Sequence, residues 1–157
     1  MKNKSLSHFL SIYSLMAFVF LCQCSPKETI TDEKYKTLSE YFSQKHDVRI
    51  SPAIKRIFVL TEKECVGCNA RFSRLISSNI NDTSSIVLVA ASGTAVDISI
   101  FTDQPTQNVY FDEEAPETNP LFAHTQAIFL KNQAVDTIVA IKAAELQQQF
   151  DFIKNRK

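Results

Sequence analysis

A Cys-x-x-Cys motif, residues 65–68, lies between a strand pattern and a helix pattern, and this arrangement constrains the fold more than any other feature of the 157 residues. Before the motif, residues 57–60 (Ile-Phe-Val-Leu) form a continuous apolar run, which is typical of a buried central strand. After it, helical spacing places four apolar side chains on one face: Phe72, Leu75, Ile76 and Ile80. Two thiols at a helix start can form a disulfide, and the helix dipole favours the thiolate of the first. Such a thiolate is the attacking species in thiol–disulfide exchange.

The first 23 residues are predicted to be a signal peptide rather than part of the fold. Lys2 and Lys4 form a short positive region, and residues 9–22 are mostly apolar. A stretch of about 14 such residues is too short for an ordinary transmembrane helix and suits a signal peptide.

The end of this stretch, residues 21–24 (Leu-Cys-Gln-Cys), resembles the cleavage box of bacterial lipoproteins. The resemblance implies lipid, palmitate included, on Cys24, and a membrane-anchored location in the cell envelope, facing the periplasm or the cell surface. Gln23 departs from the small residue usual at its position. An uncleaved anchor and an ordinary secretory signal remain as alternatives. Residues 24–32 are polar and are predicted to be a tether, which leaves residues 33–157 as one domain.

Processing at Cys24 would leave two unmodified cysteines, Cys65 and Cys68, which form either a redox centre or a structural staple. A disulfide across so short a loop constrains the unfolded chain little, which favours the redox interpretation. The processed chain carries 15 basic residues (17 minus Lys2 and Lys4) and 17 acidic ones, a net charge of −2. This balance lacks the basic footprint of a nucleic-acid partner, and no motif calls for a cofactor or metal. A monomer is expected.

Hydrophobic periodicity and turn residues predict the remaining elements. Residues 112–120 are predicted to be an acidic loop, and residues 131–133 the turn of a hairpin. Strands separated by helices pair in parallel with right-handed crossovers, whereas the hairpin makes the sheet mixed. The expected fold is α/β, a three-layer sandwich with a mixed central sheet and helices on both faces. Helices are expected at residues 33–44, 66–78, 95–101 and 143–154, and strands at 55–60, 85–91, 108–111, 127–130 and 135–141.

The order of elements and residues 57–68 resemble the thioredoxin-like superfamily, in particular the exported TlpA-like lipoprotein oxidoreductases. Residues 111–113 (Phe-Asp-Glu) and 124–130 (His-Thr-Gln-Ala-Ile-Phe-Leu) resemble further segments of that branch. The resemblance spans about residues 35–157 and implies a thioredoxin-like sandwich.

The resemblance also implies roles for four residues. Cys65 would attack a substrate disulfide, Cys68 would resolve the mixed disulfide, and Thr125 and Gln126 would lie in the loop that faces the substrate chain. The implied partners are a disulfide-containing exported protein and an upstream thiol donor, with the protein acting as a reductant.

Two positions depart from the family pattern. Gln126 stands where relatives have a cis-proline, and Val59 stands where thioredoxin has a buried aspartate. A cis bond before a non-proline residue costs about 2.5 to 4 kcal/mol, so the Thr125–Gln126 bond is predicted to be trans. The departures keep a second function open, in which the protein is a non-catalytic thioredoxin-fold lipoprotein that binds a partner.

Other polar residues near the motif allow further roles. Glu62 and Glu64 precede Cys65 and either relay a proton or are solvated loop acids, the latter being favoured. His124 is expected near the redox pair, and a metal site that joins it to the cysteines and His46 is disfavoured because no spacing demands it.

Overall fold

The structure, a computed structural model, describes residues 32–94, 96–103 and 108–156. The predicted signal peptide and most of the predicted tether, Cys24 included, lie outside the described residues. Within the described ranges, no helix is long and apolar enough to cross a membrane.

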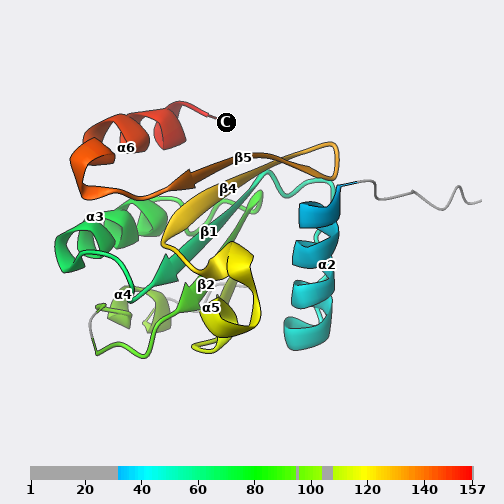
Figure 1. Ribbon diagram of the computed structural model, residues 1–157, viewed down its shortest axis with the longest axis horizontal. Coiled ribbons are helices and arrows are strands. Elements are labelled where there is room, and N and C mark those ends of the chain that lie inside the picture. The colour runs from blue at the N-terminus through cyan, green and yellow to red at the C-terminus, as the bar shows by residue number, and fades with distance from the viewer. Residues whose placement is uncertain (1–31, 95, 104–107, 157) are drawn as a thin grey trace, which may run out of the picture.

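A five-stranded mixed sheet forms the centre of the domain, in the order β3-β2-β1-β4-β5 (Figure 1). β1 pairs in parallel with β2, and β2 with β3, whereas β4 is antiparallel to both β1 and β5. The apolar runs predicted to be buried strands are β1 and β2, and each is buried along its whole length. The strands are β1 (Arg56–Thr61), β2 (Ser85–Ala90), β3 (Val109–Phe111), β4 (Gln126–Lys131) and β5 (Ala134–Ala140).

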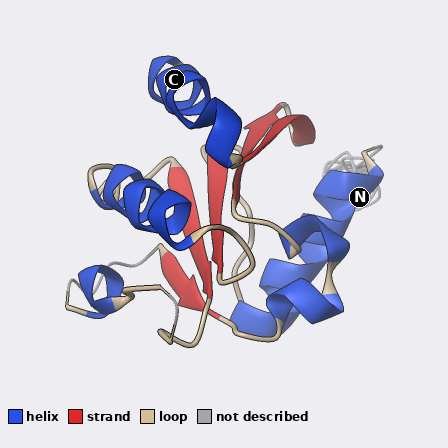
Figure 2. Cartoon of the chain, turned by 60° about the vertical axis from the view of Figure 1, so that its left-hand side comes forward, coloured by secondary structure: helices blue, strands red, loops and turns tan. Residues whose placement is uncertain are grey.

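Helices cover both faces of the sheet (Figure 2). Phe58 and Leu60 of β1 point to one face and pack in one core, and Ile57 and Val59 pack in the other, as the period of a strand requires. The first core is closed by α3 (Val66–Ser77), α4 (Ser99–Thr102) and α6 (Leu146–Asn155), and the second by α2 (Glu33–His46), α5 (Ala115–Thr118) and the 3-10 turn η2 (Pro120–Phe122). The predicted three-layer α/β sandwich is confirmed, and it is consistent with a thioredoxin-like fold.

Three details differ from the sequence prediction. Residues 112–120, predicted to be a loop, contain α5, because Pro116 occupies the first turn, where a missing N–H costs nothing. The predicted helix over residues 95–101 begins only at Ser99 in the described part of the chain, where the Asp97 carboxylate accepts the Ser99 N–H at 3.0 Å. The last helix begins with a 3-10 turn, η3 (Ala143–Glu145), before α6.

The predicted hairpin is present and its turn has a clear cause. Asn132 and Gln133 have φ values of 51° and 57°, so both central residues are left-handed. Two such residues twist the chain in the sense that suits a tight hairpin, and asparagine tolerates this conformation well. The turn brings β5 back along β4 and makes β5 an edge strand.

Arg56 anchors the end of the sheet at which β1 begins. Its side chain is 10% exposed and donates to the Ser85 hydroxyl at 2.7 Å, to Asn79, and to the carboxylate of Asp82. Burial alone acts to raise the pKa of Asp82, but hydrogen bonds from Ser84 and the Arg56 ion pair outweigh it and lower the pKa to about 2.

We predict that Asp82→Asn destabilises the protein at pH 7 and that the loss disappears in acid. The folded pKa of Asp82 lies below its unfolded value of about 3.9, so its contribution is complete above about pH 4 and is lost as the pH falls towards 2. Because the carboxylate is 32% exposed, we expect a loss of only about 1 to 2 kcal/mol. Urea unfolding of the unaltered chain and of Asp82→Asn between pH 2 and 7 measures the difference in their free energies of unfolding. A difference that is independent of pH would contradict the ion-pair account.

Candidate redox site

The two cysteines lie where β1 ends and α3 begins. Cys65 is the residue that caps α3, and it is exposed, whereas Cys68 lies one turn into the helix and is 3% exposed. The two form a disulfide. The two cysteines therefore differ strongly in exposure. Cys65 is thus open to solvent, whereas Cys68 is enclosed by the domain.

Backbone groups of α3 converge on Cys65. The N–H of Cys68 donates to the Cys65 sulfur at 3.0 Å, and the N–H of Asn69 donates to the Cys65 carbonyl at 3.0 Å. The first turn of α3 contains no acidic residue to oppose the positive end of the helix dipole. In the reduced protein, the dipole and the Cys68 N–H both favour the thiolate of Cys65 over its thiol.

A buried polar network fixes this turn to the sheet. Asn69 is 1% exposed, and its side-chain amide donates to the Thr61 carbonyl at 2.8 Å. The Thr125 hydroxyl donates to the Asn69 side-chain oxygen at 2.9 Å and accepts the N–H of Thr61 at 3.0 Å. Asn69 thereby connects the cysteine helix to the end of β1 and to the residue that precedes β4.

The sequence analysis did not identify Asn69 as part of the site. One signal was available, because Asn69 stands three and seven residues before Phe72 and Ile76 and so shares their buried helix face. A polar residue on such a face needs hydrogen-bond partners. The partners themselves come from residues 61 and 125, which only the tertiary fold brings together.

Thr125 and Gln126, the predicted substrate loop, point to different sides of the sheet. The Thr125 hydroxyl belongs to the network under α3. Gln126 begins β4 beside Val59, and its side-chain amide donates to the carbonyl of Leu121, in the layer that contains α2. The bond between them is trans, as predicted. Their contact with a substrate stays a prediction.

The acidic residues before Cys65 hold neighbouring loops. Glu64 pairs with His124, with 2.9 Å between the carboxylate and Nδ1. The Glu62 carboxylate accepts the N–H groups of Ser92 and Gly93 at 3.0 and 3.1 Å. These contacts brace the strand ends that surround the cysteine pair.

His46, considered as a partner of the cysteines in a metal site, lies elsewhere. It packs at the end of α2 against the rings of Tyr41, Phe42 and Tyr110, and burial lowers its pKa. Across residues 32–94, 96–103 and 108–156, no three His, Cys, Asp or Glu side chains are grouped to hold a metal ion.

The chain matches no known family model, and no curated protein or solved structure matches it. The fold and the site therefore carry the functional argument. They comprise an α/β domain with a mixed sheet, compatible with a thioredoxin-like fold, and a disulfide with Cys-x-x-Cys spacing at the start of a helix.

We predict that Asn69 and Thr125 are energetically coupled. Asn69→Leu and Thr125→Val should each cost about 1 to 3 kcal/mol, because each leaves buried partners without a hydrogen bond. The double variant should cost less than the sum by at least about 0.5 kcal/mol. Denaturant unfolding of the oxidised full chain measures all three.

A matched cycle with Thr37→Val provides the control. Thr37 is an exposed residue of α2, on the other face of the sheet, and its hydroxyl bonds only within its own helix. Asn69→Leu and Thr37→Val should therefore add. If the losses in free energy of unfolding for Asn69→Leu and Thr125→Val also added, the proposed hydrogen-bond network would be contradicted.

Proposed function

We propose that this protein is a lipid-anchored thiol–disulfide oxidoreductase of the bacterial cell envelope, related in kind to the TlpA-like group, that works through Cys65 and Cys68. One observation carries the proposal: an exposed helix-capping cysteine is disulfide-bonded to a buried cysteine one turn later. This is the arrangement in which one sulfur meets a substrate and the other is protected until it is needed.

The reductive direction proceeds in two exchanges. The Cys65 thiolate attacks one sulfur of a disulfide in an exported protein, and the other substrate sulfur leaves as a thiolate. The Cys68 thiolate then attacks the Cys65 sulfur, which releases the second substrate sulfur and leaves the Cys65–Cys68 disulfide. Two electrons pass to the substrate. An upstream dithiol donor restores the reduced pair by the same exchange in reverse.

The electrostatics of α3 support Cys65 as the attacking residue. Its sulfur accepts the Cys68 N–H at the positive end of the helix, which lowers the free energy of the thiolate. Exposure of Cys65 allows approach, and burial of Cys68 keeps the second thiol from reacting with anything except the mixed disulfide formed beside it.

The proposed anchor rests on the lipoprotein-like box at residues 21–24, which would place lipid on Cys24. The domain would then act as a monomer at a membrane surface, facing the periplasm or the cell exterior. Its partners would be disulfide-containing exported proteins and an upstream thiol donor.

A second candidate function is supported by Gln126. Relatives of the resembled family present a cis-proline there, whereas here the bond is trans and the amide is bound to Leu121. In this alternative the cysteine pair is a staple that fixes the start of α3, and the domain binds a partner without exchanging disulfides.

We predict that the reduction potential of the pair lies above about −300 mV, the level below which structural disulfides typically lie. The full chain would be equilibrated in dithiol–disulfide buffers of defined potential, and the reduced fraction read from the mass added by alkylation. A potential well below that level would contradict the oxidoreductase and favour the binding module. Cys65→Ser in the chain processed at Cys24 provides the control, because its single unmodified thiol cannot form an intramolecular disulfide and should show no such transition.

A further inference from the structure

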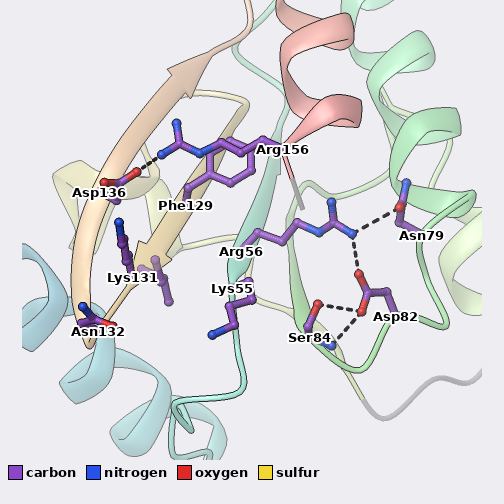
Figure 3. A pocket seen from close by; sticks show the side chains of 11 residues that line it. Lys55, Arg56, Asn79, Asp82, Ser84, Phe129, Lys131, Asn132, Asp136 and Arg156 are labelled. Atoms are coloured by element: carbon purple, nitrogen blue, oxygen red, sulfur yellow. Dashed lines mark hydrogen bonds and ion pairs between the residues drawn. The ribbon is translucent and has the colours of Figure 1, made fainter.

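A second feature lies at the opposite end of the sheet from the cysteines. A cleft of about 760 Å³ opens where β1 begins, between the end of α3 and the end of α6 (Figure 3). Arg56 in its wall and Thr61 beside the redox pair are the first and last residues of β1, so about 17 Å of strand separates the two sites. The proposed redox chemistry does not involve this cleft.

Two arginines form fixed walls of the cleft. The Arg56 guanidinium is held by Asp82, Asn79 and Ser85, as described above. The Arg156 guanidinium pairs with Asp136 and lies 4.9 Å from the centre of the Phe129 ring. Because these guanidiniums already have carboxylate partners, they contribute shape and rigidity more than free positive charge.

Two lysines supply the uncompensated charge. Lys55 and Lys131 line the same cleft and are exposed (Figure 3). The Lys55 ammonium contacts only the Pro52 carbonyl, at 3.4 Å, and within the described ranges neither lysine forms an ion pair. Four cations and two carboxylates line the cleft, which leaves a net charge of +2. Ammonium groups with free donors, beside the amide of Asn132, suit a phosphate oxyanion.

The path of the chain places this end of the domain near the proposed anchor. The last turns of α2 lie at the redox end, because Tyr41 donates to Asp112 at 2.7 Å and His46 contacts Tyr110. The 14 residues of α2 therefore begin at the other end, close to the β4–β5 turn (Figure 1). Only eight peptide steps separate Asp32 from Cys24, and they span no more than about 30 Å.

We propose that the cleft is a docking site for the phosphate groups of anionic phospholipids, and that it holds the anchored domain with its redox pair facing away from the bilayer. The inference rests on the anchorage in the proposed function and adds an orientation to it. Lys55 and Lys131 bind the headgroups, while Arg56 and Arg156 keep the cleft open. The Cys65 sulfur is then presented to soluble exported proteins.

Hydrogen exchange of the full chain on vesicles tests this proposal. The chain would be reconstituted into vesicles of phosphatidylcholine, with or without one third phosphatidylglycerol (about 30 mol%, enough to give an anionic surface). Phosphatidylglycerol should slow exchange in residues 52–57 and 129–135 and leave residues 62–68 unchanged. Two lysines near such a surface should favour the docked orientation about 30-fold.

A pair of charge-matched variants separates the cleft from general charge. Lys55→Gln/Lys131→Gln should abolish the slowing, whereas Lys45→Gln/Lys63→Gln, which removes two exposed lysines elsewhere, should retain it. If phosphatidylglycerol slowed hydrogen exchange equally in both variants, or did not slow it in the unaltered chain, the cleft would not be the docking site. Slowing by inorganic phosphate in detergent, without any effect of phosphatidylglycerol, would overturn the headgroup assignment in favour of a free phosphate ligand.

The outcome is independent of the redox assay. A Cys65→Ser/Cys68→Ser variant should dock like the unaltered chain, so an inactive cysteine pair does not affect the result. A chain that fails to remain on either vesicle would contradict the anchorage, and with it the proposed orientation.

Discussion

The hydrogen bonds of Asn69 hold together the three segments on which the proposed chemistry depends. Its buried amide joins the first turn of α3 to the Thr61 carbonyl at the end of β1 and to the hydroxyl of Thr125 before β4. A helix start that is fixed in this way presents its N–H groups to Cys65 at a constant position. Preorganised donors stabilise a thiolate without reorganisation at the moment of attack. The reactivity assigned to Cys65 therefore depends on a residue that has no redox chemistry of its own.

The two ends of the sheet have different electrostatic characters, and each arises from the local sequence. At the end with the cysteines, the carboxylates of Glu62 and Glu64 are engaged with the 92–94 loop and with His124, so they brace the site. At the other end, the two carboxylates form ion pairs with the two arginines of the cleft. The positive charges of Lys55 and Lys131 are therefore not neutralised by an ion pair. A domain with a Cys-x-x-Cys disulfide at one end and ammonium groups without ion pairs at the other is compatible with the proposed work at an anionic surface.

The sequence was sufficient to predict the sandwich and the neighbourhood of the cysteines. Apolar runs such as residues 57–60 and the helical spacing of Phe72 and Ile76 are local signals, and both elements formed where expected. The Asn69 network was missed because its partners are 8 and 56 residues away, and only the tertiary fold brings them together. Likewise, the sequence predicted a strand at residues 127–130, directly after Gln126, but strand register decides which face the Gln126 amide occupies, and the pairing of Gln126 with Val59 turns the amide towards Leu121.

The central claim, that Cys65 attacks and Cys68 resolves, is tested most directly by trapping with oxidised glutathione. In the chain processed at Cys24, Cys68→Ala and Cys65→Ala each leave one unmodified thiol and lose the same disulfide. Mass spectrometry at neutral pH would follow the glutathione adduct on each processed chain. Exposure and thiolate character predict that the Cys68→Ala chain, which retains Cys65, reacts at least about tenfold faster. Equal rates, or a faster reaction of the chain that retains Cys68, would contradict the assignment of roles and the function built on it.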